Sequence, residues 1–168
     1  MEVKYIWIGG LYMYKTRWAS FSELDIIADY WFMMATEMGE IDGIPKPDYH
    51  RAKKVKMLFV NENEAGNLMF RIAIDEKNNI VACAGGLLRL EYSFPLAEEQ
   101  SPFGWIIAVY TLEKHRNNGL AHKLVDEVCA WLKEKGASRA RLWSSSSARK
   151  IYENLGFEPM LDMSKDLT

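Results

Sequence analysis

The sequence of 168 residues has only two cysteines and no apolar run near the roughly 20 residues that cross a bilayer. Cys83 and Cys129 lie in apolar stretches without metal-ligand spacing, which favours buried thiols in a reducing compartment over a disulfide or a metal site. The N-terminus has no charged segment followed by an apolar core and a cleavage site. These absences predict a cytoplasmic protein that binds no metal and has no membrane partner.

Neither sign of charge is in excess. The chain has 21 basic and 23 acidic side chains, with a formal net charge of −2. Domains that bind nucleic acid usually carry a basic surplus, so nucleic acid is not an expected partner. The cluster of Lys53, Lys54 and Lys56 is interpreted as a solvated helix face. A length of 168 residues with 49% hydrophobic residues predicts a single domain over residues 1–168.

Hydrophobic patterns in the first half predict a mixture of strands and helices without repeats. A capping-box pattern from Ser20 to Glu23 predicts the start of a helix, and the prolines and glycine of residues 41–47 predict the loop after it. Gly85 and Gly86 lie inside a strand pattern, which indicates a bulge or a kink. The expected elements are strands at 3–8 and 11–18, helices at 20–39 and 48–63, and antiparallel strands at 68–75 and 80–92.

The second half predicts a parallel pair of strands. Residues 105–112 are almost continuously apolar, as in a central strand that is covered on both faces, and the polar residues 93–102 before them are expected to form a loop. An amphipathic helix at 119–136 serves as a crossover, so a strand at 139–143 is expected to lie parallel to the central strand. A helix at 148–155 and an extended segment from residue 157 follow.

The turn between the central strand and the crossover helix has the most informative pattern in the chain. From Arg116 to Ala121 it reads Arg-x-x-Gly-x-Ala. A strand that enters a helix through such a turn leaves several backbone N–H groups unpaired at the positive end of the helix dipole. Because this arrangement binds pyrophosphate groups, the sequence predicts a ligand that carries phosphate.

Three segments, in this order and spacing, resemble the GNAT superfamily of acetyl-CoA-dependent N-acetyltransferases. They are Val109-Tyr110-Thr111, the turn from Arg116 to Ala121, and the segment from Tyr152 to Phe157. The resemblance implies an α/β fold in which a mixed, mostly antiparallel sheet is splayed at a parallel strand pair and flanked by about four helices. Asn117 and Ala121 stand where members of the family commonly have glycine, and asparagine tolerates the unusual backbone angles of such a position.

The resemblance also implies acetyl-CoA as cosubstrate and gives roles to particular residues. Tyr152 matches the usual proton donor to the departing thiolate, and an ordinary pKa near 10 keeps it protonated at neutral pH. The main chain of Val109 and Thr111 would bind the pantetheine arm, and an N–H near Val109 or Tyr110 would polarise the acetyl carbonyl. Ser145 stands where many members have an asparagine that contacts the cofactor. The expected cofactor-binding residues are Val109, Tyr110, Thr111, Arg116, Asn117, Asn118, Gly119, Leu120, Ala121 and Ser145.

The expected enzyme is an N-acetyltransferase that acts on a primary amine of a small molecule or a protein by direct attack. Two alternatives stay open: a module that binds acetyl-CoA without catalysis, and an acyltransferase that uses another acyl-CoA or an oxygen acceptor. The sequence does not identify the acceptor, the role of the first ten residues or the oligomeric state, a homodimer included. The general base is also open, because it could be a water chain or one of Glu40, Asp42, Glu91, Glu98 and Glu99.

Overall fold

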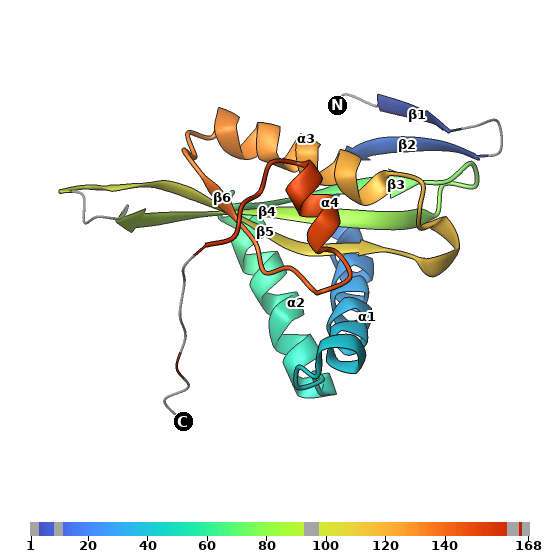
Figure 1. Ribbon diagram of the computed structural model, residues 1–168, viewed down its shortest axis with the longest axis horizontal. Helices are drawn as coiled ribbons and strands as arrows, with labels where there is room; N and C mark the ends of the chain where they lie inside the picture. The colour runs from blue at the N-terminus through green and yellow to red at the C-terminus, as the bar shows by residue number, and fades with distance from the viewer. Residues whose placement is uncertain (1–3, 9–11, 93–97, 161–164, 166–168) are drawn as a thin grey trace.

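The computed structural model describes residues 4–8, 12–92, 98–160 and 165, and within them six strands form one sheet. The strands are adjacent in chain order, antiparallel throughout except for the parallel pair of β5 and β6. Figure 1 shows α3 on one face of the sheet and α1 and α2 on the other. The predicted fold class is therefore confirmed. The elements are β1 (Lys4–Ile8), β2 (Tyr12–Trp18), α1 (Leu24–Asp42), α2 (Tyr49–Glu64), β3 (Leu68–Ile74), β4 (Ile80–Tyr92), β5 (Gln100–Thr111), α3 (Leu120–Glu134), β6 (Ala140–Arg141) and α4 (Arg149–Asn154), with short 3-10 turns at Phe21–Glu23 and Glu113–His115.

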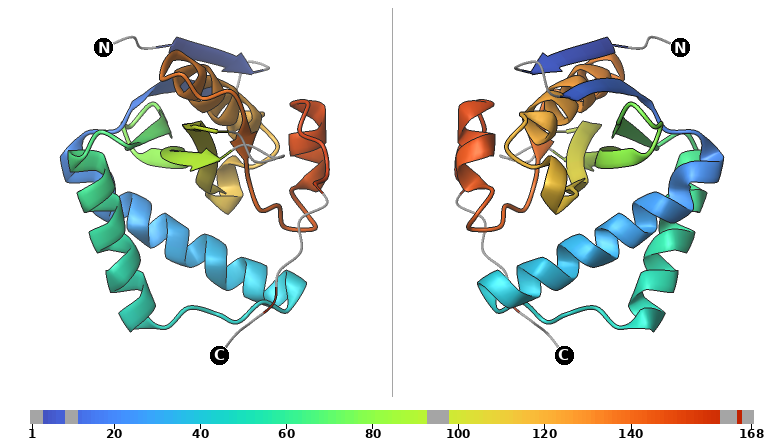
Figure 2. Two further views of the ribbon diagram at one scale, coloured as in Figure 1. Left: turned by 90° about the vertical axis from the view of Figure 1, so that its left-hand side faces the viewer. Right: turned by 90° about the vertical axis from the view of Figure 1, so that its right-hand side faces the viewer.

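The first helix begins as predicted and ends later. Ser20 and Glu23 form the expected capping box, in which the Ser20 N–H donates to the Glu23 carboxylate at 2.7 Å. The helix then passes Gly39 and ends at Asp42, because Gly43, with φ of 69°, takes the left-handed conformation that terminates it. The prediction of a loop from residue 41 is wrong by these two residues. Figure 2 shows α1 and α2 diverging from the sheet and joined at their far ends by residues 43–48.

Gly85 and Gly86 allow close packing on the two faces of β4, and they do not form the predicted bulge themselves. A Cβ atom on Gly85 would lie 2.5 Å from the ring of Phe70, and one on Gly86 would lie 2.6 Å from the side chain of Val128. Any larger residue would push these side chains away from the strand. The pairing of β4 with β5 shifts register near these glycines, and the extra residue of this bulge lies in β5.

Two boundaries in the second half differ from the predictions. Residues 100–102 belong to β5, where Pro102 pairs with Leu90, although they were expected in a loop whose residues 93–97 lie outside the described part of the chain. β6 has two residues where five were expected. Residues 157–160, expected to be extended, belong to no helix or strand. Because β6 is short, most of one edge of β5 has no paired strand among the described residues.

A buried ion pair joins α3 to the sheet. Arg71 of β3 and Glu127 of α3 are 4% and 7% exposed, and their side chains are hydrogen-bonded to each other. Burial acts to raise the pKa of Glu127, but hydrogen bonds from Arg71 and Lys123 outweigh it and lower the pKa below its usual value. The Thr16 hydroxyl of β2 also donates to this carboxylate, at 3.2 Å. The network therefore holds β2, β3 and α3 together.

Substitution of Glu127 by alanine is expected to lower the free energy of unfolding by about 3–5 kcal/mol, because it leaves the buried Arg71 charge without a partner. Urea denaturation measures the loss. Glu134→Ala, at an exposed position of the same helix, is the control and should change stability by no more than about 0.5 kcal/mol. Similar losses in the two variants would show that the ion pair does not anchor α3.

Candidate functional site

β5 contains an extra residue near the middle of the sheet. Between Ile107 and Tyr110 it advances three residues, while β4 advances two between Gly85 and Cys83. Within this bulge Ala108 has φ of 48°, a left-handed value that is rare for a residue with a side chain. Bulges of this kind change the direction of the backbone groups and occur often beside active sites.

The edge of β5 beyond the bulge carries unused backbone donors. β6 pairs with β5 at only two positions, before the bulge, and the two strands then separate. The Leu112 N–H donates to the Val81 carbonyl of β4 at 2.9 Å. Because N–H groups alternate in direction along a strand, those of Thr111 and Val109 point away from β4 toward the open edge. The edge therefore offers two N–H donors to a polar chain. The Thr111 hydroxyl is also buried without a hydrogen-bond partner among the described residues.

The start of α3 is arranged to bind an anion. Asn117 and Gly119 have φ of 62° and 69°, so the prediction that asparagine can take a glycine position in this turn is confirmed. No side chain caps α3, and its first turn has no acidic residue. The N–H groups of Leu120 and Ala121 are thus left unpaired within the helix at its positive end. The loop and the first turn together form a site where a phosphate could bind.

Arg116 of this loop is bound to Glu37 of α1. One guanidinium nitrogen donates to both Glu37 oxygens at 2.7 and 3.0 Å, and Nε donates to the Thr111 carbonyl at 3.0 Å. The guanidinium also lies over the Tyr110 ring, 5.5 Å from its centroid, and the Tyr110 hydroxyl donates to Glu37 at 2.5 Å. The side chain of Arg116 is therefore engaged in holding α1 against β5, and the backbone amides of the loop are the groups left for an anion.

Burial, the larger cause, and the Glu37 carboxylate together raise the pKa of Tyr110 to about 12. The Tyr110 hydroxyl therefore remains a hydrogen-bond donor at neutral pH. The sequence did not predict Glu37, which lies 79 residues from Arg116 in the chain. No local pattern distinguishes this glutamate from the other acidic residues of α1. A pairing between charges on distant elements could have been found only after the fold was known.

Tyr152 lies on the inner face of α4. It is 8% exposed and belongs to the same buried cluster as Leu120 at the start of α3, with its ring edge-on to Phe157. Burial raises the pKa of Tyr152 to about 12. Its position at this end of α3 is compatible with the predicted contact to a departing sulfur, a role that stays a prediction.

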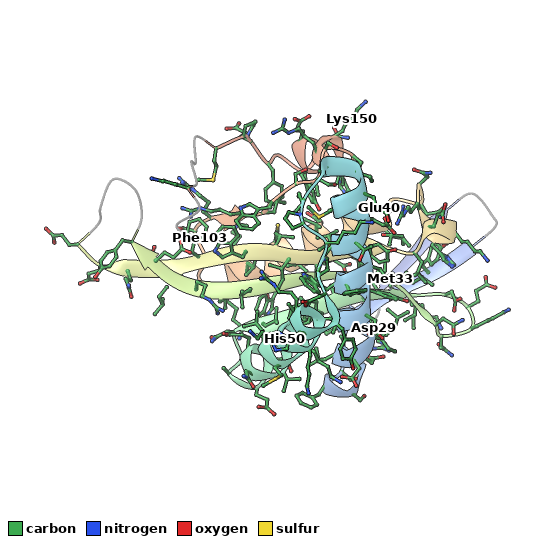
Figure 3. All side chains as sticks on the ribbon, turned by 90° about the horizontal axis from the view of Figure 1, so that it is seen from below. Asp29, Met33, Glu40, His50, Phe103 and Lys150 are labelled. Carbon is green, nitrogen blue, oxygen red and sulfur yellow. The ribbon has the colours of Figure 1, made fainter. Side chains whose placement is uncertain are left out.

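The other predicted side chains of the site are engaged locally. The Asn118 amide donates to the carbonyls of His115 and Arg116 at 3.1 and 3.2 Å, so it holds the turn in shape. Ser145 is hydrogen-bonded to Ser147 at 3.2 Å in the loop before α4. This serine loop is tied to α1, because the Ser146 N–H and hydroxyl donate to Asp42 at 3.1 and 2.5 Å. Figure 3, which views the molecule from the side of α1 and α2, shows Glu40 near the far end of α1.

The residues predicted as candidate general bases lie in two parts of the structure, the far end of the β4–β5 pair and the end of α1. Glu98 and Glu99 precede β5, and the ten residues from Glu99 to Val109 span roughly 30 Å of strand, which makes them too distant to serve the bulge directly. Glu91 pairs with Ser101 at that far end and receives the indole N–H of Trp105 at 3.1 Å. The two further candidates, Glu40 and Asp42, lie in the last turn of α1. Glu40 forms an ion pair with Lys46 at 2.9 Å.

No group of three or more His, Cys, Asp or Glu side chains in the described chain could hold a metal ion. The described helices include none that is long and apolar enough to cross a membrane. Cys83 and Cys129 are free thiols, and burial raises their pKa values to about 12 and about 11. Both thiols are therefore protonated at neutral pH, which makes them poor nucleophiles.

Residues 25–157 match the sequence model of the Acetyltransferase (GNAT) family. A comparison with curated proteins found no match. Solved structures that resemble this fold include a GCN5-related N-acetyltransferase from Ralstonia eutropha (19% identity, 92% of this chain and 98% of the other, TM-score 0.78) and a predicted acetyltransferase with acetyl-CoA from Clostridium acetobutylicum (22%, 91% and 95%, 0.78). AAC(6')-Iy in complex with a CoA bisubstrate analogue is also similar (18%, 92% and 97%, 0.67). At these identities the structural likeness concerns the fold.

If Glu37 fastens β5 and its loop to α1, Glu37→Ala should raise amide hydrogen exchange over residues 110–118 about tenfold, since one ion pair and one hydrogen bond are lost. Mass spectrometry of peptides after exchange measures the rates. Glu40→Ala removes a more exposed ion pair one turn later and should leave residues 110–118 unchanged. Equal exchange in the two variants would contradict the role of Glu37.

Proposed function

Because the chain belongs to the acetyltransferase (GNAT) family, we propose that it transfers the acetyl group of acetyl-CoA to a primary amine. One observation carries the proposal: the open edge of β5 beyond the bulge leads directly to the uncapped N-terminus of α3. Acetyl-CoA has a matching order of groups, with the thioester at one end of a polar arm and a pyrophosphate at the other. The acetyl-CoA bound by the protein from Clostridium acetobutylicum and the CoA analogue bound by AAC(6')-Iy support this choice.

In this proposal the backbone of β5 holds the reacting end of the substrate. The Thr111 N–H bonds the pantetheine arm, and the Val109 N–H, directly after the bulge, donates to the acetyl carbonyl oxygen. A donor fixed at this oxygen stabilises the negative charge that develops when the amine attacks. The amides of residues 117–121 hold the pyrophosphate, while Arg116 keeps the loop in place through Glu37.

Tyr152 stabilises the departing sulfur by a hydrogen bond. A hydroxyl with a pKa of about 12 donates well but does not lose its proton to a thiolate whose conjugate acid has a pKa near 8.5. This assigns Tyr152 a weaker role than the full proton transfer expected from the sequence. The thiolate then takes its proton from water.

The attacking amine must be neutral, and its proton must leave during the reaction. The amine nitrogen forms a bond to the carbonyl carbon, the carbon–sulfur bond breaks, and the nitrogen proton passes through water to a carboxylate. Glu37 is our candidate for this carboxylate, because it contacts Tyr110, the last residue of the bulge, and its side chain is 38% exposed. With both cysteines protonated, direct attack by the amine is favoured over an acyl-cysteine intermediate.

The test is a kinetic assay with acetyl-CoA and a panel of amines, in which release of free thiol is followed. Thiol release that depends on an amine supports the proposal. CoA binding without turnover would favour the non-catalytic module, and release that depends only on alcohols would favour an oxygen acceptor.

In the same assay Tyr152→Phe should lower turnover by about 10²- to 10³-fold, because one hydrogen bond to the developing thiolate is lost. The ring is retained, so the affinity for acetyl-CoA should stay within a few-fold. Unchanged turnover under conditions where chemistry limits the rate would show that Tyr152 serves packing alone.

The phosphate site is tested by Gly119→Asp and its uncharged match Gly119→Asn. Open space surrounds a Cβ at this position, and both residues tolerate its φ of 69° better than most. The aspartate places a negative charge where phosphate oxygens should lie, so it should abolish CoA binding, measured by calorimetry. The asparagine variant should bind more weakly than the wild type by tenfold or less. Equal affinities of the two variants would remove the basis for the phosphate site.

A further inference from the structure

Trp143 is the most exposed large apolar side chain among the described residues, at 85%. It lies two residues beyond Arg141, the last residue of β6, where β5 and β6 separate. Leu142 packs on the cluster beneath α3, so the alternation of an extended chain places Arg141 and Trp143 on the opposite face, the side of α1 and α2. A large apolar ring is therefore presented to solvent at the opening between the two strands.

The neighbours of Trp143 hold it in place from within the sheet. Its ring lies edge-on to Trp105, with centroids 6.3 Å apart and planes at 82°. The Trp105 indole N–H donates to Glu91, and the Arg141 guanidinium both donates to Glu91 at 3.3 Å and lies 5.7 Å from the Trp105 ring centroid. The same guanidinium lies 4.1 Å from the ring centroid of Phe103, which Figure 3 shows on the part of the sheet that extends away from α1.

The chain after Trp143 is fixed as well. Three residues later Ser146 donates its N–H and hydroxyl to Asp42 at the end of α1. Asp42 has no basic partner within the part of the chain that the structure describes. The opening is thus bordered by an exposed apolar ring and by a carboxylate that has no basic partner among the described residues.

We infer that Trp143 binds the acceptor, and that the acceptor is a small amine with a flat apolar body, such as an arylalkylamine. The inference rests on the proposed function. If the pyrophosphate lies at the start of α3, on one side of the sheet, and the thioester lies between β5 and β6, the amine reaches the acetyl group from the other side, where Trp143 is exposed. A flat apolar body covers the indole ring, and the negative charge of Asp42 attracts the cationic amine toward the opening before the amine loses its proton. A polyhydroxylated amine would instead place its hydroxyl groups against an apolar face without partners.

The test compares 2-phenylethylamine with ethanolamine as acceptors at saturating acetyl-CoA. Trp143→Ala should raise the KM for 2-phenylethylamine about tenfold to a hundredfold while kcat stays within a few-fold, because the lost contact is made in the ground state and the transition state alike. The kinetics of ethanolamine and the calorimetric affinity for acetyl-CoA should not change. Trp143→Phe keeps a flat ring and should restore most of the affinity for 2-phenylethylamine.

A binding measurement separates this inference from the proposed function. Calorimetry of 2-phenylethylamine with the CoA-saturated protein should detect binding in the wild type and its loss in Trp143→Ala. If this difference appears although no amine is acetylated, the proposed function fails and Trp143 remains assigned to an amine-binding site. The inference is overturned if the wild type does not bind 2-phenylethylamine, if both proteins bind it equally, or if Trp143→Ala weakens acetyl-CoA instead. A change in sedimentation with unaltered amine binding would also overturn it and would assign Trp143 to contact between copies of the chain.

Discussion

The separation of β5 from β6 is the constraint on which the rest of the site depends. The two strands pair at Gly104 and Trp105, and β6 then ends, so β5 continues with one edge free. The extra residue at Ala108 lies just beyond this point and turns the amides of Val109 and Thr111 toward the gap. Without the separation these amides would be used within the sheet. The Gly104 N–H points away from β4, toward the Arg139 carbonyl. Without the bulge, the regular alternation of N–H groups along β5 would therefore point the Val109 and Thr111 amides toward β4.

An open strand edge is stable only if its surroundings hold it, and α1 contributes to this on both sides of the gap. Glu37 binds Tyr110 and Arg116 on the side of β5, and Asp42 binds Ser146 on the side of α4. The two acidic residues are five positions apart, about 7.5 Å along a helix. One helix therefore contacts the chain on both sides of the opening, and the second contact exists because α1 ends at Asp42 rather than at Gly39.

The features that could be predicted from sequence are those set by neighbouring residues. The capping box at Ser20, the left-handed turn at Asn117 and the buried face of α3 depend on short patterns, and each is present in the structure. The bulge was assigned to Gly85 and Gly86, whereas the extra residue lies in β5, because a register is a property of two strands and not of one. The pairing of Glu37 with Arg116 joins positions 79 residues apart, and no spacing rule predicts it.

The account's central claim is that the free amides of β5 hold the substrate. Nuclear magnetic resonance of the ¹⁵N-labelled protein, titrated with acetyl-CoA, tests the claim most directly at Val109 and Thr111. We expect the amide signals of both residues, and those of residues 117–121, to shift and their hydrogen exchange to slow as the ligand binds. Binding that leaves the Val109 and Thr111 amides unchanged while other amides respond would contradict the account.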